Sequence, residues 1–469
     1  MSTCRMQQAA ESGWGDLLSE GRLPRFVLIC LGVWLGAVES LITATIMPSV
    51  AGELGGHTYF GWAVAGFLVG TVLAVASAGR LSEILGLRTA TALAGLILAA
   101  GCILSAAAPN MGVFLTGRLL QGMGSGWIAG FVMVAAALVF PERHLARVFA
   151  SATAIWGVAT VLGPLIGGLL AQAGDWRAVF WIFTLQALLF SAASVRLLKN
   201  PTTSSERTPG VPWRQLCVLG LGVSAIALAD MAASSATAAA FLVLAGLTGV
   251  GLVLRIDGRA PVRLLPRGAG NLKTICGSGY ASLFALTAAS MGLIVYGPAI
   301  LQTVRGLSPL SAGYVVAVQA MAWTVVGLAV SGASQERERR WIRLGGSCIL
   351  AGVALLALLM REAEPGAVIV GAAVIGAGFG LSSSLTNRRI LRALADEDRA
   401  IGSSALIAVR QTGAAVGAAI AGVAANLAGL GYGLTLASAQ SVSVWVFVAA
   451  LPLALAGAWA AWRLTGTAA

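Results

Sequence analysis

The chain has 469 residues, of which 58% are hydrophobic and only 10% are charged, and its mean hydropathy is +0.87. This balance excludes a soluble globular domain and indicates an integral membrane protein. The net charge of +12 does not indicate nucleic-acid binding, because basic residues spread over cytoplasmic loops give the same charge.

Fourteen apolar stretches are long enough to cross a hydrocarbon layer roughly 30 Å thick. The seventh and eighth are the weakest of the set, and without both of them the count is twelve. The predicted spans are 26–47, 61–79, 89–108, 111–139, 146–171, 178–195, 215–232, 237–254, 275–302, 310–332, 342–360, 366–386, 400–427 and 441–462.

Charge orients these spans. With the N-terminus in the cytoplasm, all but five of the 30 Lys and Arg residues fall inside, as the positive-inside rule requires. Omitting one of the weak spans would move the basic clusters 337–343 and 388–399 outside, so the count is even and fourteen is favoured over twelve. We expect a multi-pass protein of a bacterial-type inner membrane with both termini cytoplasmic and no cleavable signal peptide.

The expected fold class is all-α integral membrane: two six-helix bundles with pseudo-two-fold symmetry plus two additional central transmembrane helices. Proline, glycine and serine between the first bundle and the extra helices favour a flexible linker there. The predicted divisions are a cytoplasmic tail (1–25), the N-terminal bundle (26–198), a linker (199–214), the extra helices (215–254), a second linker (255–274), the C-terminal bundle (275–463) and a cytoplasmic tail (464–469).

Three charged residues fall deep inside predicted spans: Glu39, Arg118 and Arg410. An ionised group in the hydrocarbon layer is costly unless water or a partner supports it, so such residues are functional by default. One carboxylate against two arginines would repel a polycation. We therefore expect lipophilic neutral, weakly basic or anionic substrates.

Four segments of the first half carry recognisable motifs. The segment GRLSEILGLR (79–88) would join the second and third spans through a glycine-bearing turn. The others are RLLQGMG (118–124), ATVLGPLIGG (159–168) and ESLITATIMP (39–48). Together they resemble motifs of the major facilitator superfamily. The departures are Glu83 where Asp is usual, Leu87 where a basic residue is usual, and Glu39 where Asp is commoner.

Two segments of the second half, 306–313 and 410–417, resemble the same superfamily, and the first span resembles its fourteen-helix drug:proton antiporters. The resemblance implies that the first and fourth spans are neighbours. Glu39 and Arg118 can lie at one depth, so we predict that they form a proton-coupling pair; the alternative is a purely structural buried ion pair.

Two further sites follow from these motifs. The predicted cytoplasmic gate comprises Gly79, Glu83, Gly86 and Arg88, with Glu83 reaching a helix N-terminus or an arginine. In the antiporter motif, proline and adjacent glycines would let the fifth span bend and pack against the other half. Its residues are Gly163, Pro164, Gly167 and Gly168.

Aromatic residues and buried amides within the spans are candidates for the substrate pathway, although aromatic side chains in membrane helices more often face lipid or neighbouring helices. The predicted pathway residues are Trp34, Gln121, Trp127, Tyr296, Gln302, Gln319, Trp323, Asn387 and Arg410.

The chain has no GxxxxGK[ST] segment, so an ion gradient is the expected energy source and no cofactor is expected. Two histidines and six scattered cysteines do not suggest a metal site or an enzyme. We predict a monomeric exporter that exchanges lipophilic small molecules or drugs for protons by alternating access. The alternative is a lipid or lysolipid flippase on the same fold.

Overall fold

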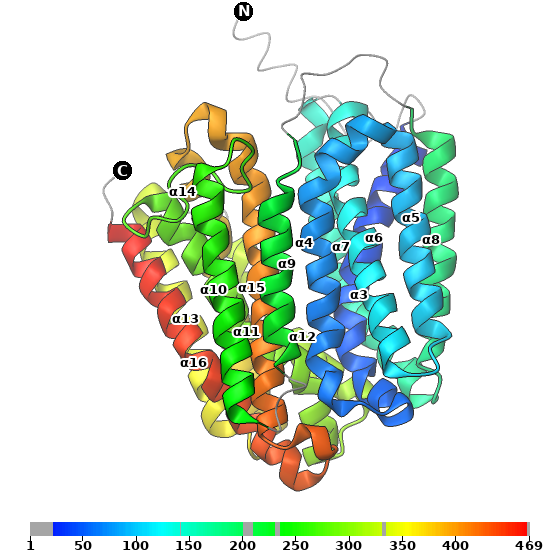
Figure 1. Cartoon of the computed structure of the whole chain (residues 1–469), viewed down its shortest axis with the longest axis vertical. Helices are drawn as coiled ribbons and strands as arrows, with labels where there is room; N and C mark the ends of the chain where they lie inside the picture. Colours follow the sequence, from blue (N-terminus) through cyan, green and yellow to red (C-terminus); the bar gives the residue numbers. More distant parts are fainter. Residues whose placement is uncertain (1–21, 141, 200–209, 230–234, 331–333, 467–469) are drawn as a thin grey trace, which may run out of the picture.

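The computed structural model describes residues 22–140, 142–199, 210–229, 235–330 and 334–466. Within these ranges every regular element is an α-helix or a short 3-10 helix. Figure 1 shows the helices side by side along the long axis of the molecule, with α3 beginning and α16 ending at the same end. The structure is therefore an all-helical bundle.

Fourteen α-helices occupy the described ranges, and the described part of each of the fourteen predicted spans lies largely on a helix of its own; residues 230–232 and 331–332 of the seventh and tenth spans lie outside the described residues. The helices are α3 (Leu23–Leu54), α4 (Phe60–Leu85), α5 (Leu87–Ala106), α6 (Met111–Val139), α7 (Glu142–Gln172), α8 (Arg177–Leu197), α9 (Trp213–Leu228), α10 (Ala236–Arg259), α11 (Ile275–Arg305), α12 (Pro309–Val330), α13 (Gln335–Leu359), α14 (Pro365–Ala393), α15 (Arg399–Leu427) and α16 (Leu436–Gly466). The 3-10 helices are η1 (His57–Tyr59), η2 (Asp396–Asp398) and η3 (Leu430–Tyr432).

Length and composition qualify 12 of these helices as membrane spans. A thirteenth is α3, if its parts Leu23–Glu39 and Ile42–Leu54, which are bent by 46°, form one span. The helix α9 has 16 residues and falls short of the length required. The described structure thus supports a multi-pass membrane protein with 12 or 13 spans, and the prediction of fourteen is not confirmed.

A side-chain hydrogen bond spans the bend of α3. The Thr43 hydroxyl donates a hydrogen bond to the Glu39 carbonyl, at 3.1 Å. A threonine bonded in this way to the residue four positions earlier competes with the helix ladder and bends helices. The bend therefore falls beside the carboxylate singled out from the sequence.

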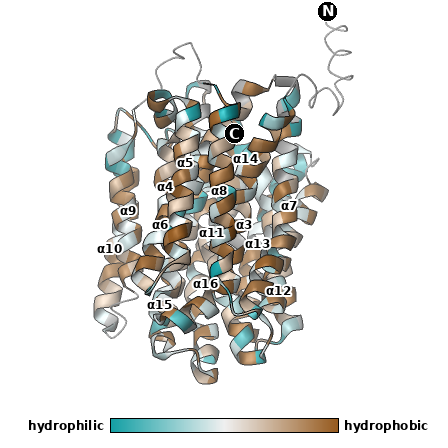
Figure 2. Cartoon of the chain, turned by 90° about the vertical axis from the view of Figure 1, so that its right-hand side faces the viewer, coloured by the Kyte–Doolittle hydropathy of each residue, from teal (hydrophilic) through white to brown (hydrophobic). Residues whose placement is uncertain are grey.

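The packing of α3–α8 is repeated by α11–α16. In the first half α3 contacts α7, α4 contacts α6, and α5 contacts α6 and α8; in the second half α11 contacts α15, α12 contacts α14, and α13 contacts α14 and α16. The halves meet through α4 with α15 and α7 with α12, which are equivalent pairs under this repeat. Figure 2 shows α9 and α10 together at one edge of the bundle, where α9 packs on α4 and α15.

Glycines of α6 bring its neighbours unusually close. A Cβ at Gly122 would lie 2.0 Å from the Phe67 carbonyl oxygen of α4, and a Cβ at Gly124 would lie 2.5 Å from the Leu98 backbone nitrogen of α5. Small residues permit such backbone contact between membrane helices. This close approach positions the polar side chains of α6 between α4 and α5.

Candidate functional site

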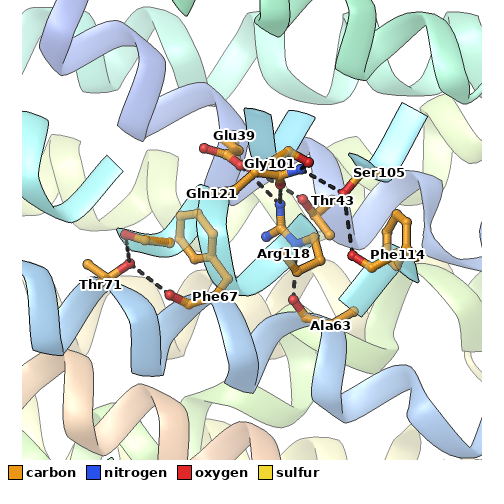
Figure 3. A network of polar contacts seen from close by, with 11 residues as sticks. Glu39, Thr43, Ala63, Phe67, Thr71, Gly101, Ser105, Phe114, Arg118 and Gln121 are labelled. Atoms are coloured by element: carbon orange, nitrogen blue, oxygen red, sulfur yellow. Dashed lines mark hydrogen bonds and ion pairs between the residues drawn. The ribbon is translucent and has the colours of Figure 1, made fainter. Parts of the chain in front are cut away.

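Glu39 and Arg118 form a buried ion pair between α3 and α6 (Figure 3). The Arg118 Nη1 atom lies 3.1 Å from Glu39 Oε1, and the two residues are 1% and 2% exposed. From the sequence, these two residues were expected at one depth on neighbouring helices. The structure brings them into contact, while their role in proton coupling stays a prediction.

The guanidinium of Arg118 has further support. Its Nε donates a hydrogen bond to the Ala63 carbonyl at 3.1 Å, and its centre lies 4.5 Å from the centroid of the Phe67 ring. It also donates to Gln121 Oε1. Arg118 thus remains hydrogen-bonded to neutral groups even without Glu39.

The Gln121 side chain is held between Arg118 and α5. Its Nε2 donates to the Gly101 carbonyl at 3.0 Å and lies 2.8 Å from Ser105 Oγ, so both polar atoms are partnered and the residue is 0% exposed. Gln121 lies one turn after Arg118 and contacts α5, whereas Arg118 contacts α3 and α4. It supports Arg118 in this structure, and its role in the substrate pathway stays a prediction.

The second carboxylate oxygen of Glu39 is in a different situation from the first. Among the described residues, Glu39 Oε2 is buried and has no hydrogen-bond partner. A buried carboxylate oxygen without a donor is unfavourable while the group is ionised and provides a place for a proton when it is neutral. The arrangement can therefore exist as an ion pair or as a neutral acid beside an arginine that keeps its other bonds.

The second half contains a different arrangement around Arg410 of α15. The guanidinium centre lies 4.8 Å from the centroid of the Trp323 ring on α12. That ring stacks on Phe379 of α14, with centroids 5.0 Å apart and planes 23° from parallel. Among the described residues, no carboxylate lies within ion-pair distance of Arg410.

Gln319 lies one helical turn before Trp323 on α12 and is 5% exposed. Its Oε1 is buried and has no hydrogen-bond partner among the described residues. The structure thus gathers a cation, two stacked rings and an unpaired amide oxygen near the middle of the second half. Arg410, Trp323 and Gln319 were predicted from the sequence, whereas Phe379 was not.

Three predicted aromatic residues are held by neighbours. The Trp34 indole donates to Gln186 on α8 at 3.2 Å, and the Trp127 indole donates to Ser77 on α4 at 2.9 Å. Both bonds lie inside the first half. Tyr296 instead stacks on Phe60 across the two halves, with ring centroids 5.5 Å apart.

Two predicted amides lie nearer to helix ends than expected. Gln302 is in the last turn of α11, and Asn387 is within two turns of the end of α14. The helices continue beyond the predicted spans, to Arg305 and Ala393, so both amides lie within helices but near their ends. Their role in the pathway stays a prediction.

The predicted gate is more helical than the motif suggested. Residues 79–85 belong to α4, and Gly86 alone separates it from α5, with φ +76° in the region that favours glycine. Glu83 forms an ion pair with Arg80 on its own helix, at 3.0 Å, and Arg88 is exposed near the start of α5. The glycine-bearing turn agrees with the sequence, whereas the second span continues as helix to Leu85, beyond its predicted end at residue 79.

The glycine–proline motif of α7 lies against the other half. A Cβ at Gly168 would lie 2.5 Å from Leu310 Cα of α12, and a Cβ at Gly313 of α12 would lie 3.0 Å from Pro164 Cβ. Gly167 faces α3, with Ile42 3.1 Å from its added Cβ, and Gly163 is buried. The tight contact between halves expected from the sequence is present.

Other neutral contacts join the halves toward the end that carries η1 and η3, which we call the η1–η3 end. Asn426 Nδ2 of α15 donates to the Thr58 carbonyl of η1 at 2.7 Å. The Tyr314 hydroxyl of α12 donates to the Val161 carbonyl of α7 at 3.1 Å. With the Tyr296–Phe60 stack, these contacts close the halves on each other there.

Sequence reasoning missed a charged cluster at the opposite end, which we call the basic end. Glu338 of α13 is 2% exposed and lies 3.0 Å from Arg388 and 3.5 Å from Arg392, both on α14. The predicted span began only at residue 342, so Glu338 lay outside it. Glu338 lies four residues before the buried Ile342. On a helix this spacing places both side chains on one face, which could have indicated an inward-facing acid.

The sequence was compared with known families and curated proteins. Residues 29–418 match the family model of the Major Facilitator Superfamily. A protein of Mycobacterium tuberculosis named "Probable multidrug-efflux transporter" is 30% identical over 438 residues, covering 90% of this chain and 92% of that protein. The "Acurin A biosynthesis cluster MFS-type transporter" of Aspergillus aculeatus is 28% identical over 410 residues, covering 84% and 73%.

Solved structures agree with this at the level of the fold. A peptide transporter POT in complex with sulfate matches with a TM-score of 0.68 at 16% identity, covering 99% of each chain. A D-xylose-proton symporter matches with a TM-score of 0.61 at 16% identity, covering 92% of this chain and 97% of that one. From the family match, the curated relatives and the repeated helix packing, the chain belongs to the Major Facilitator Superfamily and is a multi-pass membrane transporter, not an enzyme.

Proposed function

We propose that this transporter exports lipophilic small molecules in exchange for protons by alternating access. The observation that carries the proposal is the buried Glu39–Arg118 pair, in which Glu39 Oε2 has no partner among the described residues. The relative named a multidrug-efflux transporter supports the direction of transport and the kind of cargo. No cofactor is invoked, since a proton gradient supplies the energy.

The coupling step uses the two states of this pair. A proton that enters from outside neutralises Glu39 and removes its attraction for Arg118, which keeps its bonds to the Ala63 carbonyl and Gln121. The bend of α3 beside Glu39 makes that helix a suitable element to respond. Loss of the proton to the cytoplasm restores the ion pair and resets the cycle.

The cargo would meet the second half at Arg410. An unpaired guanidinium near the middle of a membrane helix costs about 3 kcal/mol. An anionic or carbonyl-bearing group of the substrate would offset that cost, while the Trp323 and Phe379 rings offer apolar stacking. The contacts between the halves at the η1–η3 end support entry of the cargo from the basic end.

The topology we propose has fourteen spans, both termini in the cytoplasm and an inner-membrane location, as in fourteen-helix drug:proton antiporters. Support comes from α9 packing along α10 and against α4 and α15, as a short span would. The charge distribution over the loops supports the orientation. The six-helix bundles, 26–198 and 275–463, would rock about the central site.

The decisive experiment uses proteoliposomes with an imposed pH gradient. We expect gradient-driven efflux of a lipophilic dye and no acceleration of phospholipid headgroup flipping. Headgroup flipping without dye transport would replace the proposal with a flippase. Dye movement at a rate independent of the pH gradient would refute proton exchange. Glu364→Gln, which changes an exposed acid paired with Arg305, serves as the control for replacement of the Glu39 carboxylate.

A further inference from the structure

A basic pocket lies at the basic end of the two extra helices. Its volume is about 770 Å³, and it is formed by the start of α9, the last two turns of α10 and the segment after α10. Arg214, Arg255 and Arg259 line it together with Trp213 and Leu252. It is separate from the Glu39 and Arg410 sites.

The three arginines have no counter-charge. Each is exposed, and within the described ranges none forms an ion pair or a side-chain hydrogen bond. Neighbouring positions two apart on a helix do not face each other, so Asp257 between Arg255 and Arg259 points elsewhere. The pocket therefore presents unneutralised positive charge.

Asp257 has a separate structural task. It is 3% exposed and accepts hydrogen bonds from the backbone nitrogens of Leu264, at 2.6 Å, and Leu265, at 2.9 Å. Gln215 donates to the Val262 carbonyl at 2.8 Å, which ties α9 to the same segment. These bonds fix the pocket wall, so the pocket is a built feature and its acid is already occupied.

The surroundings are those of a membrane interface. The candidate span Thr237–Arg259 ends at this pocket, and its apolar face is open, with Phe241 70% exposed. Trp213 is 60% exposed at the start of α9. Tryptophan and arginine at the end of a lipid-facing helix are typical of the headgroup layer.

We propose that this pocket binds the phosphate headgroup of an anionic phospholipid, whose acyl chains lie along the exposed apolar face of α10. Arginines match phosphate oxygens in charge and geometry, and basic pockets between membrane helices suit anionic headgroups. A free phosphate would gain nothing from Leu252 and the apolar face. The proposal does not depend on proton exchange or on the drug cargo.

The test is phosphatidylglycerol binding to the purified full-length protein, measured by native mass spectrometry. Each arginine contributes roughly fivefold to affinity near a charged headgroup, so Arg214→Gln/Arg255→Gln/Arg259→Gln should weaken binding about 100-fold. The control Arg337→Gln/Arg339→Gln/Arg340→Gln removes the same charge from exposed positions of α13 and should leave binding unchanged. Arg255→Gln alone, with an expected loss of roughly fivefold, tests the site if the triple variant does not fold.

Two further arms identify the ligand. Phosphatidylcholine should bind far more weakly than phosphatidylglycerol, and millimolar inorganic phosphate should not displace the lipid. Equal weakening in both triple variants would show unspecific attraction to net charge and overturn the proposal. Full displacement by inorganic phosphate would overturn it in favour of a site for a free anion.

Discussion

The two halves share one packing pattern, but each has its membrane-embedded arginine on a different helix and in a different setting, Arg118 on α6 and Arg410 on α15. In the first half Arg118 is neutralised by Glu39 and is 1% exposed. In the second half Arg410 is partly exposed and has an aromatic ring in place of an acid. A repeated scaffold thus carries a closed charge pair on one side and an open cation on the other.

This difference suggests that the two sites have different functions. A buried pair is costly to break, because removal of one partner leaves an uncompensated charge. Such a pair is suited to a proton, which changes its charge without moving bulk. An unpaired cation stacked on rings is suited to a larger ligand that brings its own counter-charge.

The largest effect is expected from Glu39→Gln, which removes the charge pair and leaves Arg118, like Arg410, without a carboxylate partner among the described residues. Gln mimics the protonated acid, and Arg118 keeps its bonds to Ala63 and Gln121. Gradient-driven efflux from proteoliposomes should fall by roughly tenfold or more, equivalent to about 1.4 kcal/mol. Substrate binding, measured by fluorescence titration, should survive.

Two outcomes would break this part of the comparison. Undiminished active efflux in Glu39→Gln would remove Glu39 from the coupling step. Loss of both folding and binding would show a structural ion pair with no role for the proton. Glu364→Gln should behave as the unmodified protein in both assays.

The contact between the halves gives the next effect. The Cβ of Gly168→Ala would lie 2.5 Å from the Leu310 backbone, which must move away, and such overpacking costs about 1–3 kcal/mol. We expect slower transport. We also expect easier cross-linking of cysteines placed on the two halves at the basic end. In the same helix, Gly157→Ala meets nothing within 4 Å and should transport normally, and equal loss in both variants would contradict the argument.

Arg410→Lys sharpens the second half of the comparison. Lysine keeps the charge but loses the planar, bidentate guanidinium and its stacking on Trp323. Transport of acidic or carbonyl-bearing compounds should fall several-fold more than transport of cationic dyes, in a panel of chemically varied substrates. Arg305→Lys, which changes an arginine in an exposed ion pair, is the control. If Arg410→Lys lost transport of every substrate equally at normal expression, a substrate role for Arg410 would be contradicted.

The smallest effect is expected from Glu83→Ala at the gate. Its pair with Arg80 is partly exposed, and such pairs contribute about 0.3–0.5 kcal/mol. Opening at the basic end should become slightly easier, so cysteine labelling of the cavity from that side should rise. Unchanged labelling and transport would make Glu83 an ordinary surface charge.

The sequence could predict the helices and the ion pair because membrane burial restricts both strongly. Long apolar runs must form helices, and an arginine and a carboxylate at similar depth must find partners. Each predicted span accordingly lies on a helix, and Glu39 meets Arg118.

Side-chain direction was harder to predict. Hydropathy does not say which neighbour a helix face meets, so Gln121, Trp34 and Trp127 were assigned to the pathway although they bond to neighbouring helices. The stack of Phe379 on Trp323 depends on the packing of α12 against α14, which no local pattern encodes. The sequence also could not decide whether α9 crosses the membrane, because its 16 residues are fewer than a span usually requires.

The three contacts described above between the halves at the η1–η3 end are formed by uncharged groups. They consist of an amide–carbonyl bond from Asn426 to Thr58, a hydroxyl–carbonyl bond from Tyr314 to Val161, and the stacked rings of Tyr296 and Phe60. Salt screens charges and leaves such contacts nearly untouched. Separation of these contacts should therefore proceed at the same rate in dilute and in saline surroundings, so an exporter of this design would keep its outward release step in external media of widely different ionic strength.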